Sequence, residues 1–202
     1  MKRTLLLTVL SAALLLSTRS QAQVPVVNKI LPEVVLGIKV GANFSQLTGN
    51  SFDNAYKAGF HGGAFVGVTK GKIGVQGEVL VRSCTYAPSS IVAAAGGQDV
   101  ATTNLDIPVL FEYKLISRLW IQLGPQFSSL ISAKSNGTDV KKTFNSTDFS
   151  GVVGLQAILP VHLVAGARYV LGMTNINNES VSGTKESWNN RSIQLYVGFR
   201  FL

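Results

Sequence analysis

The chain has 202 residues with a formal net charge of +8, and 46% of the residues are hydrophobic. This length suits a single domain, and the one cysteine, Cys84, excludes a domain held together by disulfides. Nucleic-acid binding is not indicated, because the basic residues are scattered, whereas a nucleic-acid interface requires a clustered basic patch.

The first 22 residues have the pattern of a secretory signal peptide. Lys2 and Arg3 precede an uncharged run over residues 4–16, and Ser20 and Ala22 fit a small-residue cleavage site. The uncharged run is too short for a membrane-spanning helix, which needs about 20 residues. We therefore predict cleavage after Ala22. The mature chain then keeps 15 basic and 10 acidic residues, because three of the 18 basic residues lie in the signal.

Alternation of apolar and polar residues begins after a lead-in over residues 23–33. In residues 36–45 every even position is apolar and every odd position is Gly or polar. A period of two residues indicates a β-strand with two different faces. The pattern occurs in eight segments, and no segment has a convincing helical period: residues 36–45, 58–68, 73–82, 105–114, 119–127, 149–157, 163–172 and 192–201.

The connections between these segments alternate between short and long. The short ones lie at residues 69–72, at 115–118 and near 160–161. The long ones are polar and rich in Ser, Asn and Gly, and they cover residues 46–57, 87–102, 134–147 and 175–190. In an antiparallel meander this order places all tight turns at one end. We predict an all-β domain over residues 34–202, an eight-stranded antiparallel up-and-down β-barrel.

The polar face of the predicted strands has the composition of a crowded interior. It is rich in Gly, Ser and Gln with single charges, and an eight-stranded barrel encloses a space that side chains just fill. Turning one of these Arg residues toward the middle of a bilayer would cost ~2–4 kcal/mol. We therefore predict a polar network in the lumen, formed by Lys39, Glu78, Arg82, Asp106, Glu112, Lys114, Arg168 and Arg200.

The aromatic residues of the apolar face are expected to form two belts that contact lipid. Toward the long-loop end these are Phe44, Phe60, Phe127 and Phe149, and toward the tight-turn end Phe111, Tyr113, Phe199 and Phe201. Aromatic girdles at both interfaces, short periplasmic turns and longer outer loops are features of bacterial outer-membrane barrels. The sequence thus predicts a transmembrane barrel in the bacterial outer membrane, with membrane lipid as its surroundings.

Pro108 interrupts the pattern of the fourth strand. Proline removes a donor from the ladder and belongs at edges or bulges. Because a closed barrel has no edge, we expect a local bulge at Pro108, with its ring facing the lumen. Pro125, on the apolar face of the fifth strand, raises the same problem.

Several segments resemble one known family of small barrels. The stretches LDIPVLFEYK, LWIQLGPQFSSLIS, GARYVLGMTNI and SIQLYVGFRFL are similar to the PorT-like family of bacterial outer-membrane β-barrel proteins. The resemblance covers roughly residues 34–202 and implies an eight-stranded barrel in the outer membrane. It also implies recognition by the outer-membrane insertion machinery, and a role linked to protein secretion or surface assembly.

Chemistry-bearing motifs are absent from the sequence. His61 and His162 are far apart and have no Cys or Glu at ligand spacing beside them, so no metal or other cofactor is predicted. No nucleophile motif such as G-x-S-x-G occurs. The polar clusters at residues 134–142 and 177–191 are either solvated loops or a surface for an envelope protein partner.

Three functional interpretations remain open at this point. The first is a non-enzymatic outer-membrane barrel with a structural or interaction role in the envelope. The second is an outer-membrane enzyme of the same shape, which would need catalytic groups clustered at one rim. The third is a soluble secreted barrel that binds an apolar ligand.

Overall fold

The computed structural model describes residues 32–48, 56–87, 99–177, 185 and 187–201. The predicted signal peptide, residues 1–22, and most of the predicted lead-in lie outside these ranges. No helix in the described part of the chain has the length and apolar character needed to cross a membrane.

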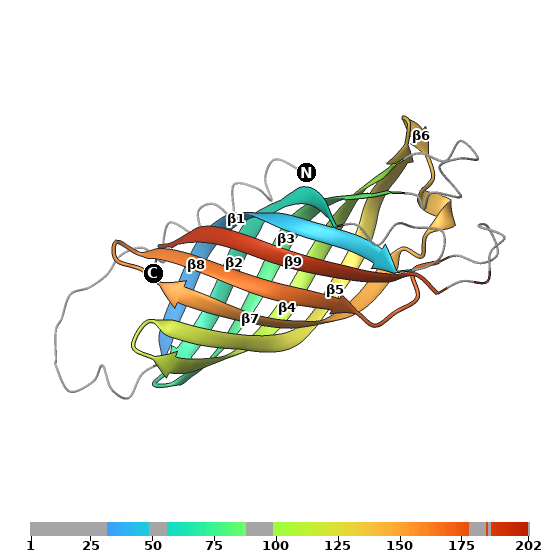
Figure 1. Cartoon of the computed structure of the whole chain (residues 1–202). Coiled ribbons are helices and arrows are strands. Elements are labelled where there is room, and N and C mark those ends of the chain that lie inside the picture. Colours follow the sequence, from blue (N-terminus) through green and yellow to red (C-terminus); the bar gives the residue numbers. More distant parts are fainter. Residues whose placement is uncertain (1–31, 49–55, 88–98, 178–184, 186, 202) are drawn as a thin grey trace, which may run out of the picture. The chain divides into compact units, whose positions relative to one another are not determined.

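Eight long strands form a closed antiparallel barrel (Figure 1). Each strand pairs with its neighbours in the chain, and closure comes from the pairing of the first strand with the last. The strands are β1 (Glu33–Thr48), β2 (Lys57–Lys70), β3 (Ile73–Tyr86), β4 (Val100–Ile116), β5 (Leu119–Ser135), β7 (Thr147–Ile158), β8 (Leu163–Gly172) and β9 (Asn189–Arg200). The predicted eight-stranded up-and-down barrel is confirmed.

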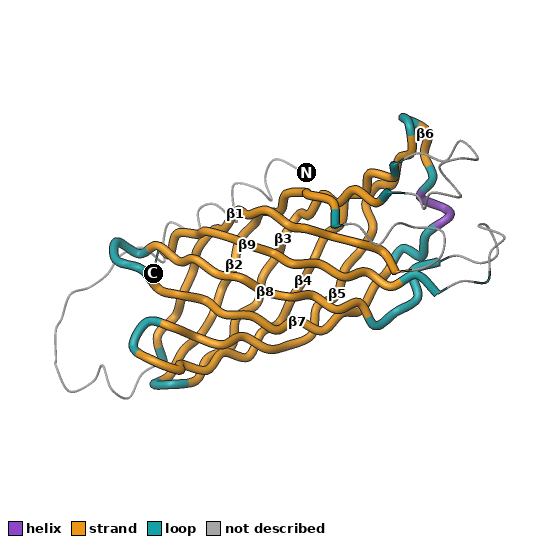
Figure 2. The backbone as a smooth tube through the Cα atoms, viewed as in Figure 1, coloured by secondary structure: helices purple, strands orange, loops and turns teal. Residues whose placement is uncertain are grey.

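Two small elements follow β5 at the long-loop end of the barrel (Figure 2). The two-residue strand β6 (Thr138–Asp139) pairs with the end of β5, and a 3-10 helix covers Lys141–Thr143. β4 and β5 each have 17 residues and start or end well beyond the predicted segments. The sequence pattern missed these extensions because polar residues such as Thr102 and Thr103 break the alternation there.

The two faces of the barrel wall differ sharply in polarity. The inward side chains include Lys39, Asp106 and Gln194, none more than 1% exposed. Their neighbours along the strands point outward, and Val40 and Leu195 are 61% and 48% exposed. A soluble monomer rarely exposes a contiguous apolar patch larger than a few hundred Å². A wall of this kind therefore requires apolar surroundings.

The three short connections are gathered at one end of the barrel, which we call the turn end. Gly71 and Lys72 join β2 to β3, and Ser117 and Arg118 join β4 to β5. Gly71 has a φ of 64°, a left-handed conformation that glycine adopts without steric cost. Residues 159–162 join β7 to β8, and the opposite end of the barrel carries the long connections.

Pro108 faces the lumen, but the expected bulge at this residue is wrong. The register between β3 and β4 is the same on either side of Pro108, from Gly77↔Val109 to Leu80↔Asp106. The register shifts between β4 and β5 lie at Thr103/Asn104 and at Lys114/Ile116 instead. The barrel accommodates the missing donor by a gap in the β3–β4 pairing, without inserting an extra residue.

Gly154 of β7 marks a close approach between two strands. A Cβ atom added to Gly154 would lie 2.6 Å from Cβ of Arg168 and 2.8 Å from the carbonyl oxygen of Ala167. We expect Gly154→Ala to lower the free energy of unfolding by about 1–3 kcal/mol, because overpacking forces neighbouring atoms to shift. Urea denaturation of the refolded barrel measures this loss.

Gly77→Ala is the matched control for this prediction. A Cβ atom added to Gly77 meets no atom within 4 Å, so this variant should keep the stability of the parent. An equal loss in both variants would assign the effect to the backbone and contradict the packing argument.

Candidate functional site

A cluster of three charges lies in the middle of the lumen. Glu78 of β3 accepts a hydrogen bond from Lys39 Nζ at 2.5 Å and another from Arg168 Nη1 at 2.8 Å. All three side chains are buried. Because each carboxylate oxygen binds a different cation, Glu78 ties β1 and β8 to β3 across the barrel.

Tyr196 of β9 packs against both cations of this cluster. Lys39 Nζ lies 4.2 Å from the centroid of the Tyr196 ring, and Arg168 Cζ lies 5.4 Å from it. The Tyr196 hydroxyl is 3.0 Å from Oε1 of Gln122 and of Gln156. The ring therefore fills the lumen between the charged cluster and the amides of β5 and β7.

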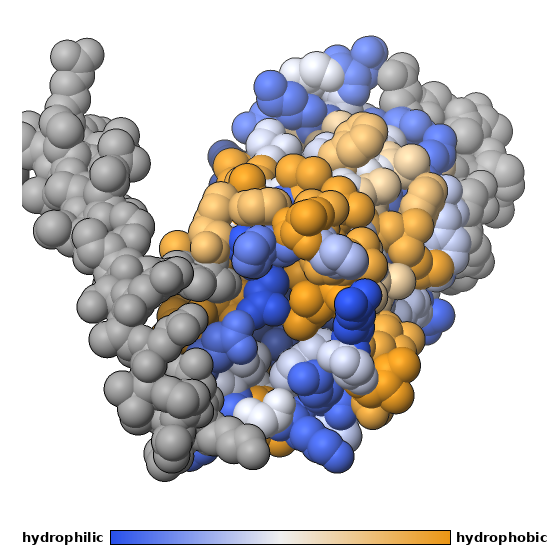
Figure 3. All heavy atoms as spheres, turned by 90° about the vertical axis from the view of Figure 1, so that its left-hand side faces the viewer, coloured by the Kyte–Doolittle hydropathy of each residue, from blue (hydrophilic) through white to orange (hydrophobic). Residues whose placement is uncertain are grey.

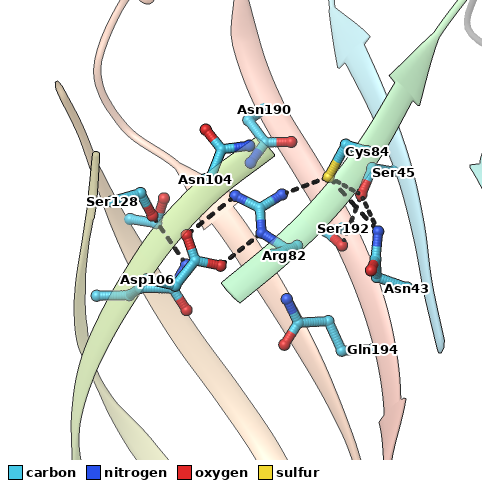
Figure 4. A network of polar contacts seen from close by, with 12 residues as sticks. Asn43, Ser45, Arg82, Cys84, Asn104, Asp106, Ser128, Asn190, Ser192 and Gln194 are labelled. Atoms are coloured by element: carbon cyan, nitrogen blue, oxygen red, sulfur yellow. Dashed lines mark hydrogen bonds and ion pairs between the residues drawn. The ribbon is translucent and has the colours of Figure 1, made fainter. Parts of the chain in front are cut away.

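A second network surrounds Arg82, closer to the long-loop end (Figure 4). Arg82 donates to both carboxylate oxygens of Asp106, with Nε–Oδ2 and Nη2–Oδ1 distances of 2.5 and 3.3 Å. Its Nη1 donates to Cys84 Sγ at 2.8 Å. Ser45 links this group to β9 through a 2.9 Å hydrogen bond to Ser192. Both networks occupy the lumen with side chains that bind one another.

A hydrophobic cap covers the lumen at the long-loop end. The rings of Phe144 and Trp188 are 5.6 Å apart. They pack with inward residues from the strand ends, and the buried members of the cap are Leu47, Cys84, Tyr86, Leu130, Ala133, Phe144 and Trp188. Residues from two long connections thus meet above the barrel.

Asparagine side chains tie these two connections together. Asn145 Nδ2 donates to the carbonyl oxygens of Asn175 and Asn177, at 2.9 and 3.0 Å. Asn175 Oδ1 accepts from the backbone N–H of Trp188 at 2.9 Å and of Asn177 at 3.0 Å. The Trp188 backbone is therefore fixed by the same network that holds Asn145.

The space left beneath the cap is small. It has a volume of about 30 Å³ and is lined by Arg82, Tyr86, Thr102, Asn104, Ser128, Leu130, Phe144, Asn145, Ser146, Asp148, Ile176 and Asn190. A cavity of about 10–15 Å³ already holds one water. The cavity therefore has room for solvent and not for an organic substrate.

The structure divides the charged residues of the predicted lumen network into two groups. Lys39, Glu78, Arg82, Asp106, Glu112 and Arg168 are all buried inside the barrel. Lys114 and Arg200 lie at the turn end instead. Lys114 Nζ is 5.5 Å from the Trp120 ring centroid, and Arg200 Nη2 is 3.1 Å from Glu33 Oε1.

The structure places all eight aromatic residues of the two expected belts on the outside of the barrel. Their exposed fractions range from 36% for Phe44 to 76% for Phe60, and the others are Phe111, Tyr113, Phe127, Phe149, Phe199 and Phe201. Phe127 and Phe149 are paired across β5 and β7. The rings of Phe199 and Phe201 are 5.6 Å apart near the turn end.

Sequence reasoning missed the cap. Residues 134–142 and 177–191 were left open between solvated loops and a partner surface, and the cap residues Phe144 and Trp188 were not singled out. The sequence feature that indicates the cap is the presence of these two large aromatic residues within otherwise polar connections. Within the described ranges, no three His, Cys, Asp or Glu side chains lie close enough together to hold a metal ion.

Known proteins share this architecture. The family model "Outer membrane protein beta-barrel domain" matches residues 21–178, more than half of the chain. The solved structure of Ail from Yersinia pestis with a heparin analogue has 16% identity and a TM-score of 0.51, over 84% of this chain and 99% of Ail. Neisserial surface protein A has 14% identity and a TM-score of 0.53, over 82% of this chain and 97% of its own. A comparison with curated proteins found no match.

The family match and the apolar outer wall agree on the location of the barrel. The protein lies in the bacterial outer membrane, which excludes the soluble secreted alternative. At these identities the two solved structures establish the fold alone. The chain belongs to the family of outer membrane protein β-barrel domains.

Proposed function

We propose that this barrel is a non-enzymatic protein of the cell envelope that presents its cap to partners at the cell surface. Short turns of outer-membrane barrels face the periplasm and longer loops face outward, so the cap would lie outside. The observation that carries the proposal is the cap itself. Its packed aromatic residues and asparagine hydrogen bonds form an ordered surface over a filled lumen.

The lumen chemistry supports this role over that of an enzyme. Four acidic groups are buried in the interior. Glu78 binds two cations, Asp106 binds Arg82, Glu112 accepts a hydrogen bond from Gln122, and Asp148 accepts one from Ser150 through Oδ2. A catalytic acid or base must reach the substrate within hydrogen-bond distance. Asp148 lines the cavity beneath the cap, but a volume of about 30 Å³ leaves no room for an organic substrate beside it, and the other three acids are held by neighbouring side chains.

The finer role that we propose is an accessory of protein secretion or surface assembly. Its support is the resemblance to PorT-like barrels, carried by Ile107-Pro108 on β4 and Gly124-Pro125 on β5. Because one fold hosts many functions, the identity of the partner protein would decide whether the barrel serves secretion or surface assembly. The insertion machinery of the outer membrane is the expected transient partner during assembly.

Photo-crosslinking in intact cells tests the cap as an interaction surface. A crosslinking residue at Thr138, which is exposed on β6, should yield a defined protein adduct. The same residue at Leu195, on the apolar outer wall, should yield no such adduct. Loss of the Thr138 adduct in Trp188→Ala would tie it to the cap. Absence of any adduct at Thr138 in the parent protein would contradict the proposal.

The filled lumen also predicts that the barrel conducts no ions. In planar bilayers we expect no steady open channel, because the buried ion pairs around Glu78 and Arg82 block the path below the cap. Trp188→Ala should stay closed for the same reason. Steady conductance of the parent protein would overturn the sealed lumen, and conductance of Trp188→Ala alone would make the cap the only seal.

A further inference from the structure

A cavity at the turn end has no role in the function proposed above. It has a volume of about 100 Å³ and is lined by Glu33, Val35, Gly67, Thr69, Gln76, Glu112, Lys114, Trp120, Gln156, Ile158 and Arg200. Figure 3 views this end of the barrel and shows hydrophilic residues in its centre, with hydrophobic residues along much of its edge. We call it the turn-end cavity.

Two hydrogen-bond donors of the turn-end cavity lack acceptors. Lys114 forms no salt bridge within the described residues, and its Nζ lies 5.5 Å from the Trp120 ring centroid. Trp120 is 5% exposed, and its buried Nε1–H has no hydrogen-bond partner in the described part of the chain. A buried donor without a partner costs about 1–3 kcal/mol. This cost identifies a place where an acceptor would be favourable.

Both carboxylates that line the cavity already have a partner. Glu112 Oε1 accepts from Gln122 Nε2 at 2.6 Å. Glu33 Oε1 lies 3.1 Å from Arg200 Nη2, and the Glu33 side chain is 67% exposed. Exposed ion pairs contribute only about 0–1 kcal/mol. An incoming carboxylate can therefore replace Glu33 on Arg200 at little cost.

The size and the charge of the surroundings favour a small anion. At about 10–15 Å³ per water, the 100 Å³ of the cavity hold several water-sized groups, which is enough for a carboxylate and the carbon atoms of its side chain. Lys70, Lys72 and Arg118 are exposed around the tight turns, and residues 71–72, 117–118 and 159–162 contain no acid. Such a one-sided charge distribution attracts acidic ligands.

We propose that the turn-end cavity binds the side-chain carboxylate of an acidic peptide that reaches the barrel from the periplasm. Lys114 and Trp120 donate to the carboxylate, and Arg200 exchanges Glu33 for it. The cavity is lined by side chains at the turn end of the strands and by none of the apolar outer wall, which favours a peptide from the periplasm over a lipid headgroup as the source of the carboxylate. This site lies at the opposite end from the cap and is independent of the surface role.

Trp120 supplies a fluorescence signal for the test. The chain contains two tryptophans, so the full barrel with Trp188→Phe leaves Trp120 as the only one. The probes are blocked Gly-Gly-Glu-Gly-Gly and its Gln counterpart, added to the refolded barrel in detergent at constant ionic strength. We expect a saturable change in Trp120 fluorescence with the Glu peptide and none with the Gln peptide. Equal responses to the two peptides would overturn the proposal.

Variants at two lysines distinguish binding in the turn-end cavity from general electrostatic attraction to the basic surface. Lys114→Gln should weaken binding of the Glu peptide at least tenfold, and Lys72→Gln, in an exposed turn, should leave it within about twofold. Heat-modifiable gel mobility verifies that both variants are folded. Unchanged binding in Lys114→Gln would contradict the site. Tighter binding of glycerol 3-phosphate than of the Glu peptide would identify a lipid headgroup and overturn the peptide assignment.

Discussion

Replacing Glu78 by Gln is expected to lower the free energy of unfolding by about 3–5 kcal/mol, the cost of breaking a buried ion pair from one side. The substitution keeps the shape of the side chain but removes the only carboxylate that binds Lys39 and Arg168 among the residues that the structure describes. Both cations would then remain buried, next to each other and without a counter-charge. Urea denaturation of the barrel refolded in lipid vesicles measures the loss.

Glu33→Gln is the matched control for this experiment. It removes the carboxylate of the Arg200 ion pair, which lies at the turn end with Glu33 mostly exposed. An exposed pair contributes about 0–1 kcal/mol. The loss in the free energy of unfolding should therefore be several times larger for Glu78→Gln than for Glu33→Gln. Similar losses for Glu78→Gln and Glu33→Gln would contradict the view that the central cluster holds the lumen together.

The barrel was predictable because its strands alternate over long stretches with few exceptions, such as Pro108 and Leu110 on the otherwise polar face of β4. In residues 105–114, for example, odd positions carry the apolar residues and even positions carry Asp106, Glu112 and Lys114. A period of two fixes the strand and the two faces. The direction of the apolar face then followed from the cost of turning charged residues toward lipid.

The partners within the lumen were not predictable from the same pattern. Lys39, Glu78 and Arg168 lie on three different strands, and their contact depends on the register of every pairing between them. Alternation gives the face of a residue but not its height in the barrel. For this reason Lys114 and Arg200 were grouped with the central charges, although they lie at the turn end.

The cap escaped prediction for a different reason. Connections have no period from which a face can be read. The positions of Phe144 and Trp188 depend on hydrogen bonds between the segments around residues 145 and 175, which only the closed barrel brings together. The burial of these two residues above the lumen nevertheless fits their apolar character. Large aromatic side chains stabilise a protein mainly through the area that they bury.

Placing Arg at Leu195 is expected to destabilise the barrel by about 2–4 kcal/mol, the cost of a cationic side chain near the middle of a bilayer. Leu195 is 48% exposed on the outer wall of β9, midway between Arg191 and Phe199. The inward neighbour Gln194 is fully buried, so the Arg side chain cannot turn into the lumen. Unfolding in vesicles of defined lipid measures the change.

Leu115→Arg tests whether the cost of an outward Arg depends on its depth in the bilayer. Leu115 is 49% exposed and lies one residue from the end of β4 at the turn end. Near an interface the cost of Arg falls to about 0–1 kcal/mol, because the side chain reaches water. Equal losses at Leu195 and Leu115 would mean that the two positions do not differ in depth. A larger loss at Leu115 would place the apolar band elsewhere on the barrel.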